Sequence, residues 1–311
     1  MSVICLSGGV GGARFAKGLQ SLLPPGDLRI VVNTGDDFQL HGLHICPDVD
    51  SVLYSLAEIN DKERGWGRAN ETWHCLNVLR DLGQPDWFHL GDKDLAIHIV
   101  RTNQLRLGMS LKEVTDDFCI RFGISTSIIP MTEDPVATWL RTDSGLMNFQ
   151  EFFVKQRAQP VVQNVIYKNI ENARLHPFVV EAMQDSSLEA IFIAPSNPFL
   201  SSDPILSLPG MRSLICERRV PCVAISPLVG SKAVKGPLGE MLDSLKGSRS
   251  PDVFVKHYSG LIDGLILDDS DVRYSSSINI PSFFCSTLMT DDDARTSLAR
   301  IAMQFARELN V

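Results

Sequence analysis

The chain has 311 residues, of which 44% are apolar and 21% charged, and it carries a net charge of −8 at pH 7. The size suits one large globular domain, while the negative charge argues against a nucleic-acid groove or an anionic membrane surface as partner. Seven scattered cysteines without a C-x-x-C pair argue against a disulfide framework and a zinc site. Without a basic region before the short apolar amino-terminal segment, we expect a cytoplasmic protein that binds small molecules.

The amino-terminal region predicts a strand, an anion-binding turn and a helix. An apolar strand from Val3 leads into a glycine-dense turn, and an amphipathic helix is predicted over residues 15–23. The turn contains four glycines: Gly8, Gly9, Gly11 and Gly12. Glycines let backbone amides approach a ligand, and the helix start directs N–H groups and the positive dipole end to the same place. We expect a bound phosphate; the alternative is a turn that only packs helix on strand.

This turn differs from both standard nucleotide-binding fingerprints. Arg14 stands where a G-x-G-x-x-G motif has its third glycine, and no Gly-Lys-Ser or Gly-Lys-Thr follows as in a P-loop. A Rossmann oxidoreductase with Asp36 or Asp37 on a ribose is therefore a weaker alternative, and it predicts dinucleotide binding without Mg²⁺ dependence.

Further elements alternate as in a parallel α/β fold. Strands are predicted at residues 28–32, 127–130, 190–194, 222–226 and 265–267. Helices are predicted at 51–59, before a C-cap at Gly83, at 110–122 with a capping box, and at the carboxyl end with Thr290 as N-cap. These elements predict a Rossmann-like open, mainly parallel sheet with helices on both faces. A hairpin between residues 136–141 and 146–154 indicates a small inserted subdomain at about 130–180 within a single domain over 1–311.

Two carboxylates precede the helix predicted at 51–59. Asp48 and Asp50 are two residues apart, a spacing that lets both face one site in an extended turn. Carboxylate oxygens suit Mg²⁺, which bridges to substrate phosphates. The alternative is that Asp50 caps the helix while Asp48 is solvated.

A second acidic cluster contains a lysine. Lys93 lies between Asp92 and Asp94 on a predicted loop before an apolar run at 95–100. It is either a mobile contact to a phosphoryl group or substrate oxygen, or part of a solvated turn. For His98, inside the apolar run, a core position is favoured over catalysis.

Polar residues also follow the carboxyl ends of two predicted central strands. Ser196 and Asn197, next to Pro198, follow one strand, and Ser226 follows the other. The carboxyl edge of an open sheet is where ligands bind, so these side chains are candidates for a base or phosphate; the alternative is selection for turn geometry.

Motifs along the whole chain resemble the 2-phospho-L-lactate transferases of coenzyme F-420 biosynthesis. They occur in order at residues 7–11 (SGGVG), 31–37 (VVNTGDD), 47–54 (PDVDSVLY), 90–94 (LGDKD), 129–136 (IPMTEDPV), 195–198 (PSNP), 208–211 (LPGM), 226–227 (SP) and 287–289 (TLM).

The resemblance implies a transferase that uses Mg²⁺. The ribityl hydroxyl of the deazaflavin Fo would attack the phosphorus of a three-carbon phosphoacid joined to GMP, and GMP would leave. Asp50 and Lys93 match the flavin-site positions, the second of which is often arginine in the family. Asp48 and Asp50 would hold the metal, with Asp50 alternatively the base that orients or deprotonates the hydroxyl. The nucleotide would contact Ser7, Gly8, Gly9, Gly11, Gly12, Asn33, Thr34, Ser196, Asn197, Pro198 and Ser226.

The resemblance further implies a homodimer and leaves a second function class open. Related gluconeogenesis-factor-like proteins share the glycine turn, so the runner-up is a non-catalytic regulator that binds a nucleotide or nucleotide sugar. The Asp48 and Lys93 clusters distinguish the two, since a sensor has no need of a metal site beside an acceptor pocket. The donated acid, phospholactate, phosphoenolpyruvate or phosphoglycerate, is left open by the sequence.

Overall fold

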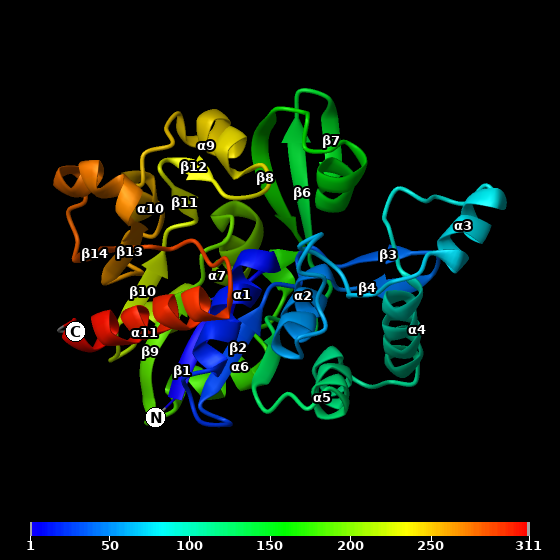
Figure 1. The fold of residues 1–311 in the computed structure, drawn as a ribbon, viewed down its shortest axis with the longest axis horizontal. Helices are drawn as coiled ribbons and strands as arrows, with labels where there is room; N and C mark the ends of the chain where they lie inside the picture. The colour runs from blue at the N-terminus through cyan, green and yellow to red at the C-terminus, as the bar shows by residue number, and fades with distance from the viewer. Residues whose placement is uncertain (1, 310–311) are drawn as a thin grey trace.

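The computed structural model describes residues 2–309 and centres on a sheet of seven parallel strands (Figure 1). The order is β14-β13-β10-β9-β1-β2-β5. The bounds are β1 (Ser2–Ser7), β2 (Leu28–Val32), β5 (Ser127–Pro130), β9 (Leu188–Ile193), β10 (Cys222–Ile225), β13 (Gly264–Asp268) and β14 (Ser282–Cys285). Since β1 pairs with β2 on one side and β9 on the other, its carboxyl end lies at the switch point where open α/β sheets bind ligands.

Helices cover both faces of this sheet, because its buried strands are apolar on both sides. The helices are α1 (Gly9–Gln20), α2 (Pro47–Leu56), α3 (His74–Asp81), α4 (Asp92–Arg106), α5 (Leu111–Arg121), α6 (Pro177–Gln184), α7 (Asp203–Ser207), α8 (Met211–Cys216), α9 (Leu238–Lys246), α10 (Asp252–His257) and α11 (Asp292–Glu308). In β1, Val3 and Cys5 join the core with α1, α2, α5 and α11, whereas Ile4 and Leu6 join the core with α6 to α10. The predicted α/β class is confirmed.

Small antiparallel sheets are added to this framework. β6 (Ala137–Thr142), β7 (Gly145–Asn148) and β8 (Val162–Lys168) form a three-stranded sheet inside the region predicted as a subdomain. β3 (Phe38–Leu40) pairs with β4 (Leu43–Ile45), and β11 (Leu228–Val229) pairs with β12 (Lys232–Ala233). In Figure 1 the β6–β8 sheet rises above the carboxyl edge of the central sheet, and β3, β4 and α3 extend to one side.

Several predicted boundaries are wrong for identifiable reasons. α1 begins at Gly9 instead of residue 15, so Gly11 and Gly12 belong to the first helical turn. The predicted loop at 92–94 is the first turn of α4, where acidic residues favour a helix start. A π-helical turn at Glu151–Lys155 replaces the end of the predicted strand 146–154.

The predicted cap of the last helix is also wrong by one residue. Asp291, rather than Thr290, is the N-cap of α11, and its carboxylate accepts from Ala294 N at 2.8 Å. The capping box of α5 is confirmed, with Ser110 and Glu113 bonding each other's backbone N–H. Within residues 2–309, helices long and apolar enough to cross a membrane are absent.

Candidate active site

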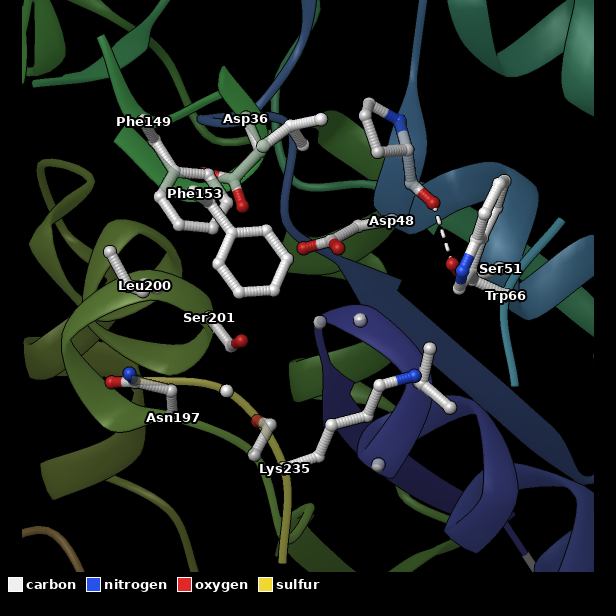
Figure 2. A pocket seen from close by; sticks show the side chains of 18 of the residues that line it. Asp36, Asp48, Ser51, Trp66, Phe149, Phe153, Asn197, Leu200, Ser201 and Lys235 are labelled. Carbon is white, nitrogen blue, oxygen red and sulfur yellow. Dashed lines mark hydrogen bonds between the residues drawn. The ribbon is translucent and has the colours of Figure 1, made fainter. Parts of the chain in front are cut away.

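A cleft of about 980 Å³ opens at the carboxyl ends of the central strands (Figure 2). One wall is the glycine turn after β1 with the first turn of α2. The opposite wall comes from the turn after β9 and from the π-helical turn beside β7. The segment before α4 and the loop after β12 complete it, so residues far apart in sequence meet at the switch point.

Two features of the structure account for the glycines of this turn: close packing against neighbouring atoms and exposure of the backbone to the cleft. A Cβ on Gly11 would lie 2.2 Å from Pro195 O, and one on Gly8 would lie 2.6 Å from Ser201 Cβ. One on Gly12 would lie 2.4 Å from Ser7 Oγ. Gly9 has a φ of +62° and lines the cleft, as do Gly8 and Gly11. Close packing thus explains three of the glycines, and the turn still presents backbone to a ligand.

Asp48 faces the glycine turn from the first turn of α2. Asn33 Nδ2 donates to Asp48 Oδ2 at 2.9 Å and to Leu200 O at 3.1 Å, which fixes the carboxylate. In Figure 2 the carboxylates of Asp48 and Asp36 point toward the same open space. Burial raises the pKa of Asp48 to about 7, and burial together with the Asp48 charge raises the pKa of Asp36 well above its ordinary range. Asp36 Oδ1 is buried without a hydrogen-bond partner in the described part of the chain.

Asp50 has a different environment, although it also lines the cleft. Arg101 clamps it through both guanidinium ends, Nη1 lying 3.0 Å from Oδ2 and Nη2 contacting Oδ1. The Arg101 side chain is 1% exposed, and the Asp50 charge helps raise its pKa against the effect of burial. α2 starts at Pro47, so the predicted extended turn is a helical turn in which residues two apart point in different directions. Asp48 and Asp50 nevertheless line the same cleft, each with its own partners.

Asp94 and His98 complete the Asp50 side of the cleft. His98 Nε2 lies 3.5 Å from Asp94 Oδ1, and Tyr54 donates to that oxygen at 2.5 Å. Arg101 Nη1 lies 3.1 Å from His98 Nδ1, and since an arginine can only donate, a neutral His98 carries its proton on Nε2. Burial acts to raise the pKa of Asp94, but the hydrogen bonds from His98 and Tyr54 and the charges of His98 and Arg101 lower it overall. His98 is buried, as predicted, but it also lines the cleft.

The other predicted site residues divide into two groups. Ser196, Asn197 and Ser226 line the cleft, whereas Ser7, Gly12, Asn33, Thr34 and Pro198 lie behind its surface. Lys93 is exposed on the first turn of α4, outside the group of residues that line the cleft.

Sequence reasoning missed the remaining charges and the aromatic wall. Arg14 and Lys235 bring positive charge to the glycine turn. Besides Tyr54, the tryptophans and phenylalanines of the cleft are Trp66, Trp87, Phe88, Phe149 and Phe153. A signal was available for Arg14, which occupies the third fingerprint position, and for Asp94 and His98, whose i,i+4 spacing places them on one helix face.

Sequence comparisons with known proteins identify the family of this chain. The family model described as 2-phospho-L-lactate transferase CofD matches residues 3–281. A phosphoenolpyruvate transferase of Streptomyces coelicolor is 38% identical over 99% of both chains. A 2-phospho-L-lactate transferase of Methanosarcina mazei is 36% identical over 97% of this chain and 99% of its own.

A solved structure shares the fold at low sequence identity. The UPF0052 family protein BH3568 of Bacillus halodurans superposes with a TM-score of 0.62 at 13% identity, covering 97% of this chain and 98% of that one. This likeness concerns the fold alone. The family match and the two relatives show that the chain belongs to the 2-phospho-L-lactate transferase family and is a transferase.

Proposed function

We propose that the protein transfers a three-carbon phosphoacid from its GMP anhydride to the ribityl hydroxyl of the deazaflavin Fo, in coenzyme F-420 biosynthesis. The observation that carries this proposal is the division of one cleft into two surfaces. Backbone, hydroxyl and cationic groups surround the glycine turn, and aromatic rings line other parts of the cleft. A nucleotide phosphate suits the first surface and a planar tricyclic ring suits the second.

The nucleotide side would use groups from three strand ends. The start of α1 at Gly9 supplies N–H groups, and Ser196 and Ser226 supply hydroxyls. Arg14 and Lys235 would offset phosphate charge; Lys235 Nζ donates to Gly65 O at 3.1 Å across the cleft. Burial lowers the pKa of both cations, with a further contribution to Lys235 from Arg14, so an anion between them would relieve their repulsion.

The acceptor side would hold Fo between aromatic groups. Figure 2 shows Phe149 and Phe153 at one side of the cleft and Trp66 at another. Trp66 is 40% exposed, so a ring stacked on it would remove apolar surface from water. In this arrangement the ribityl chain would extend toward α2 and α4.

Mg²⁺ fits the pair Asp36 and Asp48 better than the predicted pair Asp48 and Asp50. Asp36 has a buried oxygen without a hydrogen-bond partner among the described residues, it lies beside a second buried carboxylate, and burial raises the pKa of both groups. Asp50 is already neutralised by Arg101. Bound there, Mg²⁺ would neutralise charge on the phosphoryl oxygens.

The chain's own residues would act mainly by positioning. The new bond joins the ribityl oxygen to phosphorus, the anhydride bond to GMP breaks, and the hydroxyl proton leaves to water. Asp94, whose pKa is lowered, is a hydrogen-bond acceptor rather than a strong base, and His98 Nε2–H is a donor. Asp50 would act by holding Arg101 and hence His98. Such transfers depend on alignment and charge stabilisation more than on covalent help.

The direct test offers Fo, Mg²⁺ and each guanylylated phosphoacid in turn, with product masses read by mass spectrometry. We expect GMP release and one new Fo adduct with at least one donor, lost in Asp48→Asn and in Asp36→Asn. Val272→Ala, at an exposed position outside the cleft, is the matched control. Nucleotide binding without any adduct, for all three donors, would favour the regulator instead.

A further inference from the structure

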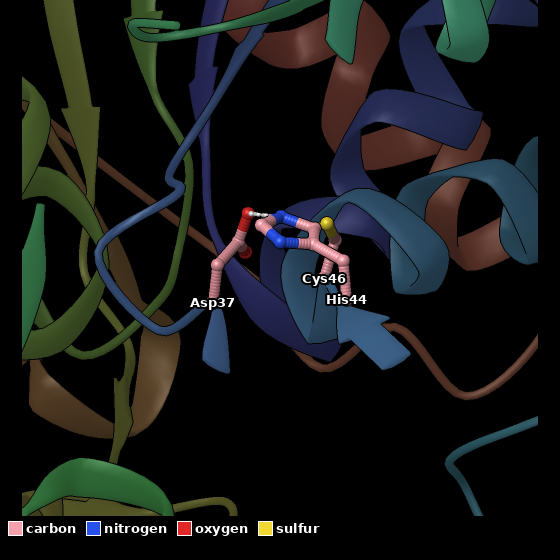
Figure 3. Close-up of side chains that lie close together, drawn as sticks. All are labelled: Asp37, His44 and Cys46. Carbon is pink, nitrogen blue, oxygen red and sulfur yellow. Dashed lines mark ion pairs between the residues drawn. The ribbon is translucent and has the colours of Figure 1, made fainter. Parts of the chain in front are cut away.

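Three potential metal ligands meet beside the cleft. Asp37 follows β2, His44 lies in β4, and Cys46 lies at the start of α2. One donor atom from each lies within 4.8 Å of the others, and Asp37 Oδ2 is 3.5 Å from His44 Nε2. Figure 3 shows the carboxylate and the imidazole facing each other with the sulfur alongside.

The burial of this cluster leaves a polar group unsatisfied. The Asp37 side chain is 9% exposed, and its Oδ1 has no hydrogen-bond partner within residues 2–309. Cys46 is fully buried, while the His44 side chain is 27% exposed. A buried carboxylate oxygen without a partner is costly unless something compensates its charge. The cluster therefore has a buried carboxylate oxygen without a partner, and His44 is its most exposed member.

We propose that Asp37, His44 and Cys46 form a Zn²⁺ site. Zinc accepts thiolate, imidazole and carboxylate ligands together in tetrahedral geometry, and three protein ligands leave a fourth position for water. Magnesium and calcium require more oxygen ligands than the single carboxylate offers. The partial exposure of His44 provides the entry path and the position of the water.

The surroundings suit a metal-bound histidine. Gln39 Nε2 lies 2.9 Å from His44 Nδ1, so this side-chain amide already contacts the nitrogen that faces away from Asp37. With Nε2 on zinc, His44 would carry its proton on Nδ1, and the amide, turned by 180°, would accept it through Oε1. Arg101 Nη1 also donates to His44 O at 3.4 Å, and this hydrogen bond fixes the backbone of β4.

Binding at Cys46 requires loss of the thiol proton. Burial raises the pKa of Cys46 well above its ordinary range, and the Arg101 charge acts in the opposite direction. As the Zn–S bond forms, the thiol proton passes to solvent, with no change in oxidation state. The metal-free cluster would hold a neutral thiol, and the zinc form would hold a thiolate.

The site is distinct from the cleft and independent of the proposed reaction. None of the three residues is among those that line the cleft in the described chain. Its effect would be to tie the turn after β2 to β4 and α2. The spacing Asp-x₆-His-x-Cys contains no cysteine pair, which explains why the sequence expectation argued against zinc.

Cobalt titration of the metal-stripped full chain tests the site. Co²⁺ bound to a thiolate gives a charge-transfer absorption in the near ultraviolet that carboxylate and imidazole ligands do not. We expect it to saturate at one Co²⁺ per chain and to disappear when Zn²⁺ is added. Cys46→Ser should abolish the absorption, and His44→Ala should weaken Zn²⁺ binding by at least about 10- to 100-fold. Cys216→Ser, at an exposed cysteine, should leave both unchanged.

Two results would overturn the proposal. One is a parent protein that shows no thiolate absorption at saturating Co²⁺, and the other is an absorption that persists in Cys46→Ser. Circular dichroism of the metal-free variants checks folding, and His44→Ala changes a partly exposed side chain, so it remains informative if the buried cysteine variant does not fold. Cobalt held by Asp50, Asp94 and His98 would lack the thiolate signal, so the two clusters are distinguishable.

Discussion

The first turn of α2 carries two aspartates whose carboxylates lie in different electrostatic environments. Asp48 faces Asn33 and a second carboxylate, Asp36, and its pKa is raised to about 7. Asp50, two residues later, is clamped by Arg101. The Asp50 carboxylate is thus paired with a cation, whereas the Asp48 carboxylate lies beside an amide and a second carboxylate.

This difference explains why a pair of aspartates in one motif need not share a role. A group whose charge is uncompensated can be stabilised by a ligand cation, so it is suited to binding. A group whose charge is fully paired holds its partners in place, and removing it leaves a buried cation alone. The Asp48 carboxylate is thus suited to binding a cation, whereas the Asp50 carboxylate is suited to holding Arg101 in place.

The largest effect is expected from Asp50→Asn. It would leave the Arg101 guanidinium buried and unpaired, and breaking such a pair lowers the free energy of unfolding by about 3–5 kcal/mol. Urea denaturation measures the loss. The double variant Asp50→Asn with Arg101→Gln is the control and should recover part of it; a single variant within about 1 kcal/mol of the parent would show that the pair is not a main support.

Asp48→Asn should instead raise the stability of the folded protein near neutral pH, by a smaller amount that depends on pH. The folded state binds the Asp48 proton more tightly than the unfolded chain, so this stabilisation is complete below an ordinary pKa of 3.8 and is lost as pH rises through about 7. The variant does not titrate there, so its stability relative to the parent should rise by about 2 kcal/mol or more between pH 4 and 7. Thermal denaturation in chelator at several pH values measures this, and a flat difference would contradict it.

Gly11→Ala tests the packing of the glycine turn. The added methyl group would meet Pro195 O, a backbone atom, and overpacking of this kind lowers stability by about 1–3 kcal/mol. Displacement of the turn should also weaken GMP binding by tenfold or more in calorimetry. Val10→Ala, in the same turn, removes atoms and serves as control; equal GMP affinity for Gly11→Ala and the parent would separate the turn from the nucleotide.

The smallest effects concern two lysines. Lys235→Ala should weaken GMP binding by about fivefold, since an exposed charged contact contributes about 1 kcal/mol. Lys93→Ala should change transfer kinetics less than threefold, because its side chain is exposed outside the cleft lining. Steady-state kinetics with Fo as the varied substrate decides this, and a tenfold rise in KM for Lys93→Ala would restore the predicted flavin contact.

Much of the framework follows from local sequence signals. Apolar runs such as residues 28–32 and 222–226 have no other place than the interior of a parallel sheet, and Ser110 with Glu113 marks a helix start through backbone bonding alone. β14 and β8 escaped prediction because their side chains are mostly half-buried or exposed and lack a continuous apolar run.

The site was less predictable because its pairings are long-range. The Asp50–Arg101 clamp joins residues 51 positions apart. The pKa of Asp48 is raised by burial and by the charge of Asp37, which follows β2. Local spacing predicted that Asp48 and Asp50 face one site in an extended turn, but α2 starts at Pro47, so the two carboxylates line the cleft with different partners. Tertiary structure decides such electrostatic partners.

The position of β1 at the middle of the sheet also bears on synthesis of the chain. β1 and its neighbour β2 both lie within the first 32 residues, whereas its other neighbour, β9, begins only at Leu188. The Pro195 carbonyl that packs against Gly11 belongs to the turn after β9. A nascent chain that ends before Leu188 therefore lacks the residues that pack against the glycine turn, and the cleft can be completed only when the second half of the chain has been made.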